Sequence, residues 1–127
     1  MREFSVTLLN RPGQLAALAR KLADAGVNIE TLAALAVDGE SLARFMVDDD
    51  EAARRTLREA GVRFEERVVL DTFLPNQPGS LAAMAEGLAS SGINIDSIYL
   101  LHSSADGLHF AVTVDDAEAA GAVMAAS

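Results

Sequence analysis

The chain has 127 residues, half of them hydrophobic, which is enough to build a core and fits one average domain or two very small ones. It contains no Cys, and this excludes a disulfide scaffold, a thiol nucleophile and thiolate metal sites. Its formal net charge of −9 disfavours a nucleic-acid groove and an anionic membrane surface, because both need clustered Lys and Arg.

The first residues of the chain do not have the pattern of a targeting segment. Residues 1–6 alternate polar and apolar side chains, whereas a signal peptide has a basic stub followed by an apolar run. No stretch approaches the roughly 20 apolar residues that are needed to span a bilayer. We therefore expect a cytoplasmic protein, and the abundance of Ala and Arg is typical of GC-rich bacteria.

Basic residues are confined to the first half of the chain. All ten lie within residues 1–67, whereas residues 68–127 carry seven acidic residues and neither Lys nor Arg. A charged ligand held by the second half must therefore be bound by backbone dipoles, carboxylates or side chains from elsewhere.

The sequence contains an internal repeat. Residues 10–30 align with residues 76–96 at an offset of 66 without a gap, and twelve of the 21 pairs are identical. Further on, the Val-Asp-Asp of residues 47–49 matches residues 114–116 at an offset of 67, so we infer that a hairpin has gained one residue. Two copies are too few for a solenoid and indicate two tandem units, 1–67 and 68–127.

The first unit alternates strands with helices. Leu side chains recur at helical spacing after the Asn-Arg-Pro-Gly breaker, Pro12 suits the first helical position, and Gly26 suits the helix end. An Asp-Gly pair at 38–39 predicts a hairpin. The expected elements are a strand at 4–9, a helix from Pro12, strands at 27–37 and 42–47, a helix at 51–60 and an extended run at 62–66.

The second unit repeats this order up to its last helix. The expected elements are a strand at 68–74, a helix at 79–91, a hairpin of strands 93–102 and 108–114 around Asp106-Gly107, and a weak helix at 116–126. The last strand of the second unit is missing. The fold class is therefore α+β: two tandem ferredoxin-like βαββαβ units, each an antiparallel sheet with its helices on one face. Units of about 60 residues are marginal alone, so we expect them to pair within or between chains.

The repeated Asn-x-Pro-Gly motif, at residues 10–13 and 76–79, opens a helix in both units. The free N–H groups of a helix N-terminus can hold a carboxylate, and Gly lets a ligand approach the backbone. Asn28 and Asn94 follow the Gly that ends each helix, and their amides could hold the polar head of an amino acid. Two structural readings stay open: Pro-Gly as a tight turn, and Asn as a backbone cap.

This combination of Asn-x-Pro-Gly-x-Leu, a Leu-lined helix and Gly-Val/Ile-Asn-Ile resembles the ACT domain, a small regulatory module that binds amino acids. The resemblance covers nearly the whole chain as two copies and implies units that pair side by side. It implies an amino-acid ligand between the first loop of one unit and the second strand of its neighbour. The candidate ligand-binding residues that it implies are Asn10, Gly13, Gln14, Leu15, Asn28 and Ile29, with Asn76, Gly79, Ser80, Leu81, Asn94 and Ile95.

Other patterns favour structural roles. The acidic residues at 48–51 are echoed at Asp115-Asp116 and precede the second helix of each unit, which favours capping over metal binding. His102 and His109 face each other if their hairpin centres on 105–106, and are separated if it centres on 106–107. Because no third ligand is near them in sequence, we interpret them as surface residues and expect no metal site.

An enzyme is not expected, since there is no P-loop, no Gly-x-Gly-x-x-Gly and no recognisable acid/base pair, and no cofactor is implied. The sequence favours a stand-alone amino-acid-binding regulatory protein. It would form a homo-oligomer, most simply a dimer, and act on an enzyme of amino-acid metabolism. The alternative is a non-catalytic assembly module that acts only through protein–protein pairing.

Overall fold

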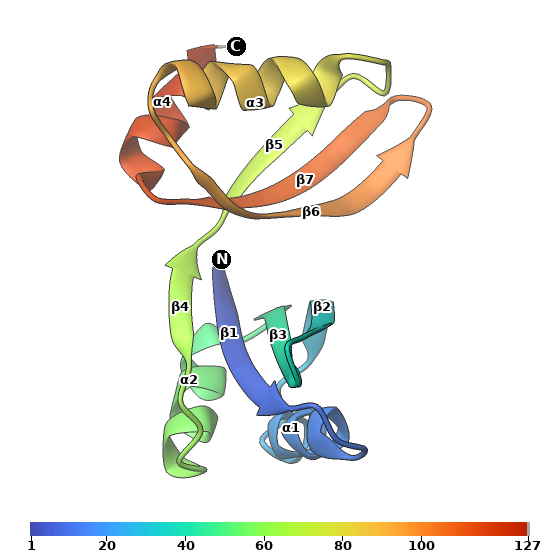
Figure 1. Cartoon of the computed structure of the whole chain (residues 1–127), viewed down its shortest axis with the longest axis vertical. Helices are drawn as coiled ribbons and strands as arrows, with labels where there is room; N and C mark the ends of the chain where they lie inside the picture. The colour runs from blue at the N-terminus through green and yellow to red at the C-terminus, as the bar shows by residue number, and fades with distance from the viewer. Residues whose placement is uncertain (127) are drawn as a thin grey trace. The chain divides into compact units, whose positions relative to one another are not determined.

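Residues 1–126 are described by the structure, a computed structural model, with side chains described up to Met124. The chain divides into two units, Met1–Arg67 and Val68–Ser127. Each unit builds its own sheet and its own hydrophobic core (Figure 1).

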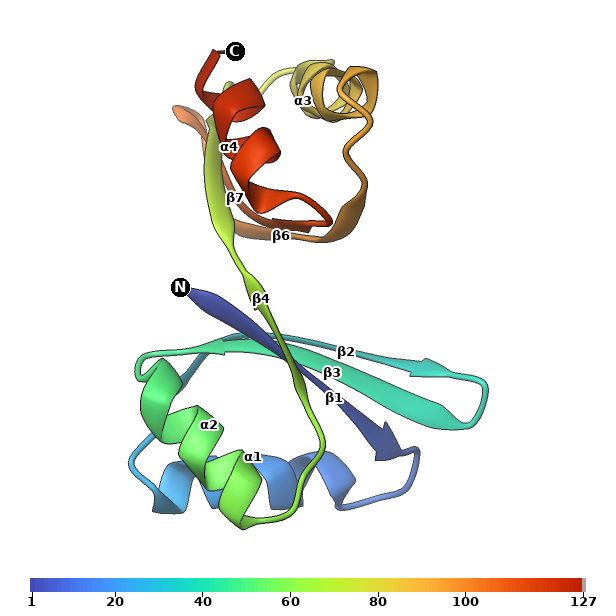
Figure 2. The ribbon, with the colours of Figure 1, turned by 90° about the vertical axis from the view of Figure 1, so that its left-hand side faces the viewer.

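The first unit is a four-stranded antiparallel sheet with strand order β2-β3-β1-β4. Its two helices cover the same face of that sheet (Figure 2), as the ferredoxin-like topology requires. Its elements are β1 (Arg2–Leu9), α1 (Gln14–Asp24), β2 (Ile29–Val37), β3 (Glu40–Val47), α2 (Asp50–Glu59) and β4 (Glu65–Val68).

The core of the first unit lies between the sheet and its helices. Alternate residues of β1 point inwards, so Phe4 and Val6 are fully buried there. The rings of Phe4 and Phe45 stack at 5.8 Å between centroids. Helical spacing places Leu18 and Leu22 on the buried face of α1, where they pack against this cluster.

The second unit is a three-stranded antiparallel sheet with strand order β5-β7-β6. Helix α3 buries Met84 and Leu88 against Phe110 and Val112 of β7. Within residues 1–126, no strand pairs with the other edge of β5, which agrees with the expected α+β fold and its missing last strand. Its elements are β5 (Leu70–Leu74), α3 (Ser80–Ser90), β6 (Ile95–Ser104), β7 (Gly107–Val114) and α4 (Ala117–Ala126).

Two expectations about element boundaries are wrong. Pro12 is not the first helical residue, because Gly13 takes a left-handed conformation as the N-cap and α1 begins at Gln14. Val68 does not begin the first strand of the second unit. It ends β4, because the extended chain pairs in the first sheet up to this residue and in the second sheet from Leu70.

The extra residue of the second unit lies in a strand and not in the turn. The pairing of β6 with β7 shifts between Leu100 and His102, so a bulge at Leu101 absorbs the added residue. The hairpin turn is then Ala105–Asp106, and His102 pairs in register with His109. The alternative in which the two His face each other is therefore the one observed.

An ion pair ties α2 to β4 in the first unit. Arg54 donates two hydrogen bonds to Glu66, from Nε at 2.9 Å and from Nη2 at 2.7 Å. These bonds, with the charge of Arg54, hold the pKa of the Glu66 carboxyl below its usual value. A bidentate pair of this kind is geometrically specific and stronger than a single hydrogen bond between neutral groups.

This pair predicts a pH-dependent contribution to stability. Because the folded-state pKa of Glu66 is lowered, the pair stabilises the folded protein above the unfolded-state pKa, about 4.3 for Glu. The contribution is lost as the pH falls through the lowered folded-state value. Urea unfolding of wild type and Glu66→Gln should therefore differ at about pH 7, and the two should converge as the pH falls below the lowered folded-state pKa of Glu66. A difference that is independent of pH would contradict this assignment.

The packing predicts which leucines carry stability. Leu22→Ala should lower the free energy of unfolding by about 2–5 kcal/mol, because its side chain is fully buried and its removal leaves a cavity. Leu9→Ala is the control, since Leu9 is 52% exposed at the end of β1 and its substitution should change the free energy by less than about 0.5 kcal/mol. Urea denaturation followed by circular dichroism measures both, and equal losses would contradict the proposed core.

Candidate functional site

Helices α1 and α3 begin in the same unusual way. Each has a left-handed glycine as its N-cap, Gly13 with φ = 88° and Gly79 with φ = 92°. A side chain is strained in this conformation, which explains why both copies carry Gly. No heavy atom lies within 4 Å of where a Cβ would stand at either position, so the space beside the backbone is open in the described part of the chain.

The turn before each of these helices is closed by backbone bonds alone. Gln14 N–H donates to the Arg11 carbonyl at 3.4 Å, and Ser80 N–H donates to the Gln77 carbonyl at 3.3 Å. Neither N-cap offers a side-chain acceptor, and neither first turn contains an acidic residue. The backbone N–H groups in the first turns of α1 and α3 therefore lack the side-chain acceptor that usually caps a helix N-terminus.

Helices α2 and α4 provide the contrast within the same chain. The carboxylate of Asp49 accepts from Ala52 N–H at 3.0 Å, and that of Asp116 accepts from Ala119 N–H at 3.1 Å. The capping role expected for this acidic cluster is confirmed at both residues. No group of three or more residues that could hold a metal ion occurs in the described part of the chain.

Asn10 and Asn76 tie the turns to the hairpins of their own units. Asn10 N–H donates to the Gly39 carbonyl at 3.3 Å, and Asn76 Nδ2 donates to the Ser104 carbonyl at 2.8 Å. The Asn76 amide nitrogen therefore has a structural role, although it binds a hairpin carbonyl and does not cap the helix. Each turn is fastened to the end of the hairpin beside it.

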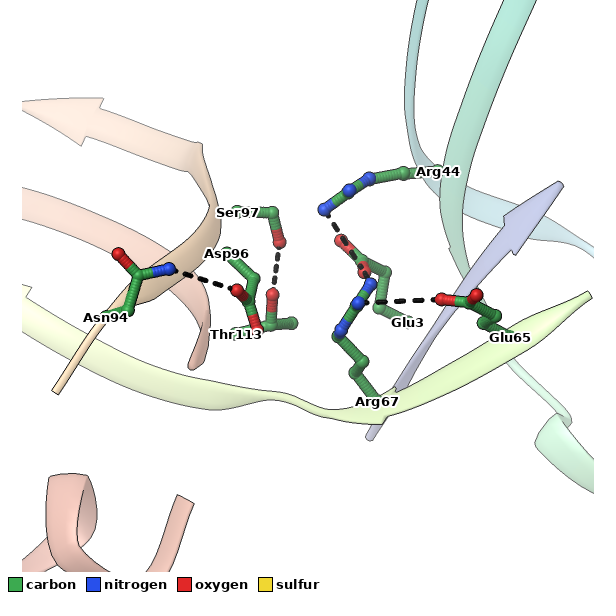
Figure 3. Close-up of polar contacts among 8 residues, drawn as sticks. All are labelled: Glu3, Arg44, Glu65, Arg67, Asn94, Asp96, Ser97 and Thr113. Atoms are coloured by element: carbon green, nitrogen blue, oxygen red, sulfur yellow. Dashed lines mark hydrogen bonds and ion pairs between the residues drawn. The ribbon is translucent and has the colours of Figure 1, made fainter. Parts of the chain in front are cut away.

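Asn28 and Asn94 sit at the other end of the units' first helices. The backbone N–H of Asn28 donates to Asp48 Oδ1, and that of Asn94 donates to Asp115 Oδ1, both at 2.9 Å. Asn94 also donates from Nδ2 to Asp96 Oδ1 at 3.2 Å (Figure 3). These two Asp anchors were not predicted, although the repeated Val-Asp-Asp was the sequence signal that marked them.

The remaining candidate residues divide between surface and core. Leu15 and Leu81 are 37% and 46% exposed in the first turns of α1 and α3, where an apolar side chain borders the open helix start. Gln14 and Ser80 are half-buried at the same helix starts. Ile29 and Ile95 are also half-buried and pack against the cores of their units.

A groove of about 620 Å³ opens directly at the α3 start. Gln77, Pro78 and Gly79 of the turn that precedes the helix line it, and all of its lining residues are uncharged. The lining residues are Thr72, Phe73, Leu74, Pro75, Gln77, Pro78, Gly79, Ser80, Ala83, Met84 and Met124. The turn of the second unit therefore borders a space large enough for a small organic molecule.

The His pair belongs to a separate hollow of about 470 Å³ on the same unit. His109 Nε2 lies 2.8 Å from Asp71 Oδ1, and its ring stacks on Phe73 at 4.3 Å between centroids. His102 lines this hollow beside it and is exposed. The surface location expected for these His is observed for His102, whereas His109 is half-buried by its two partners.

A buried carboxylate was not anticipated. Glu3 is fully buried, and its Oε1 lies 3.9 Å from Arg44 Nη1 and 4.0 Å from Arg67 Nη1 (Figure 3). Arg67 also lies 3.5 Å from Glu65. The sequence does not predict this cluster, because no local pattern brings Arg44 and Arg67 to Glu3.

Comparisons with known proteins identify the fold. No family model matches the sequence, and no curated protein matches it. Protein BT0572 from Bacteroides thetaiotaomicron superposes with a TM-score of 0.84 at 21% identity, over 98% of this chain and 86% of that one. The regulatory subunit of aspartate kinase from Thermus thermophilus gives 0.68 at 21%, over 98% and 88%, and that from Thermus flavus gives 0.68 at 23%, over 98% and 88%.

The chain has the fold of these regulatory subunits. At such low identities the similarity establishes the fold and leaves the ligand to be argued from the residues themselves. Among the described residues, no helix is both long enough and apolar enough to cross a membrane.

The contrast between helix starts predicts where capping contributes stability. Asp49→Ala should lower the free energy of unfolding by about 0.5–2 kcal/mol, because Ala52 N–H loses its acceptor. Ser80→Ala at the α3 start should cost less, since the Ser80 side chain is not a cap. Thermal unfolding of the two variants measures the difference. An equal loss at Ser80 would mean that α3 also depends on a side-chain cap.

Proposed function

We propose that the chain is an amino-acid-binding regulatory protein of the ACT type. The observation that carries this proposal is the pair of uncapped helix starts at Gly13 and Gly79, beside helices in the same chain that Asp residues cap. A chain that caps α2 and α4 but leaves α1 and α3 open in both copies retains two positions for an external anion.

The ligand's carboxylate would lie on the first-turn N–H groups of α1 or α3. Gly at the N-cap lets it approach the backbone, and the partial positive charge of the helix start stabilises it without Lys or Arg. This suits the second unit, which has no basic residue. The ligand's ammonium would meet an Asn amide oxygen or a nearby carboxylate, with Asn28 and Asn94 as the candidate residues.

Regulation would follow from a ligand-dependent change in how units pair through their edge strands. Edge strand β2 exposes apolar side chains, with Leu32 43%, Leu35 67% and Val37 49% exposed, and it is free on one edge in residues 1–126. Such an edge favours a neighbouring unit, most simply that of a second copy in a homodimer. A ligand that binds the paired state stabilises it by mass action. The fold shared with regulatory subunits of aspartate kinase supports an enzyme of amino-acid metabolism as the target.

The same exposed strand also supports a second candidate, an assembly module without a ligand. In that case the oligomeric state should be the same with and without amino acids. Light scattering across a concentration series distinguishes the two candidates, because only the regulatory protein predicts a ligand-dependent mass or a ligand-dependent dimer affinity.

A thermal-shift screen of the twenty amino acids tests the ligand site. At a ligand concentration about 100 times its Kd, binding should stabilise the folded state by about 2.7 kcal/mol and raise the unfolding temperature by several degrees. Gly79→Ala should reduce the shift contributed by the second unit, because the added Cβ enters the open space beside the α3 start. Isothermal titration of the same variant measures the loss of affinity.

The matched control is Gly92→Ala in the same unit. Gly92 also has a left-handed conformation, with φ = 72°, but it lies at the end of α3 and not at its start. Both substitutions should lower the unfolding temperature through backbone strain, and only Gly79→Ala should weaken ligand binding. No shift with any amino acid, or an equal loss of binding in the two variants, would contradict the proposed site.

A further inference from the structure

A hollow of about 270 Å³ lies on the face of the first sheet that points away from α1 and α2. Phe4 and Val6 of β1 point into the core, so the alternate residues Ser5 and Thr7 lie on this opposite face. The hollow, called the Arg63 hollow below, is lined by Ser5, Thr7, Leu42, Arg44, Arg63, Phe64 and Glu65. Its lining therefore brings two guanidinium groups and two hydroxyl groups, all hydrogen-bond donors, to one place, with a single carboxylate among them.

Arg63 is the cation of this hollow that has no carboxylate partner. Arg44 lies 3.9 Å from Glu3, and Glu65 lies 3.5 Å from Arg67 (Figure 3). Arg63 is exposed, and within residues 1–126 its side chain makes neither an ion pair nor a hydrogen bond. The one carboxylate that lines the hollow is thus already held by an arginine outside the lining, and the charge of Arg63 is available to a ligand.

The second unit has a carboxylate at the equivalent place on its sheet. Ser5 corresponds to Asp71 in the repeat, and Leu42 corresponds to His109. There the Oδ1 atom of Asp71 lies 2.8 Å from Nε2 of His109, so the chain supplies its own anion. In the first unit a neutral hydroxyl stands at this position, and the adjacent cation is left without such an anion.

We propose that the Arg63 hollow binds a small oxyanion, and that a phosphate group fits it best. Guanidinium groups hold phosphate oxygens through parallel N–H donors, and the Ser5 and Thr7 hydroxyls can donate to further oxygens. A phosphate group carries about −1.5 to −2 charges at pH 7 and at least three acceptor oxygens, so it matches several donors better than a carboxylate does. The hollow is smaller than the roughly 300–1,000 Å³ of drug-sized ligand sites, which favours a small ligand. This inference does not depend on the amino-acid site at the helix starts.

Titration of the full chain with inorganic phosphate at constant ionic strength tests this proposal. The backbone N–H signals in ¹⁵N NMR spectra report where the anion binds. We expect saturable shifts centred on Ser5, Thr7 and Arg63, with a Kd of about 1 mM, and weaker binding of acetate. Shifts centred on Gln14 or Ser80 would place the anion at a helix start and contradict the proposal.

Two variants that lose the same charge locate the site. Arg63→Gln removes the cation that lines the hollow, whereas Arg55→Gln removes an exposed cation of α2 that does not line it. Arg63→Gln should weaken phosphate binding by about tenfold, and Arg55→Gln should change it by less than about twofold. Because both side chains are exposed, both variants should keep the fold, which circular dichroism checks.

A third variant gives the first unit the carboxylate of the second. Ser5→Asp should abolish phosphate binding because it places a negative charge in the hollow, whereas the uncharged control Ser5→Asn should keep the Kd within about threefold. The proposal is wrong if phosphate does not bind at about 20 mM, or if acetate binds as tightly as phosphate. It is equally wrong if the two arginine variants bind phosphate alike, or if Ser5→Asp binds it as the wild type does.

Discussion

The left-handed glycine at the start of α1 and α3 is the constraint from which the proposed chemistry follows. A residue with φ near +90° turns the chain directly from the strand into the helix, and in this chain both such turns are closed by backbone bonds. No Asx or hydroxyl side chain then covers the first N–H groups, so the dipole of each helix start faces an open space. The other two helices differ, because the carboxylates of Asp49 and Asp116 cap the N-termini of α2 and α4.

The two units have kept this turn while diverging in charge. The first unit neutralises its own carboxylates with arginines, through Arg54 on Glu66 and through Arg44 and Arg67 on the buried Glu3. The second unit has no arginine, and two of its acidic residues bind backbone N–H groups at Asn94 and Ala119. Backbone N–H groups bind acidic residues in both units, since Asp48 and Asp49 accept from Asn28 and Ala52 in the first unit, whereas arginines are present in the first unit alone.

One extra residue in β6 changes which side chains pair across the β6–β7 hairpin of the second unit. In the first unit, Leu35 of β2 pairs with Leu42 of β3. The bulge at Leu101 shifts the second hairpin so that His102 pairs with His109 at the equivalent place. The second unit therefore has a pair of His side chains where the first unit has a pair of Leu side chains. The two copies thus share a scaffold and differ in what their surfaces can contact.

The sequence alone determined the duplication, the order of strands and helices and the glycine turns, because periodicity, Gly and Pro act on neighbouring residues. Tertiary structure decided the rest. Whether Val68 belongs to β4 or β5, where the extra residue is absorbed and which arginines reach Glu3 all depend on pairing between distant segments. The bonds from Asp48 and Asp115 to the Asn backbones have the same origin. The groove at the α3 start exists only once three separate segments pack together, and no local pattern encodes that packing.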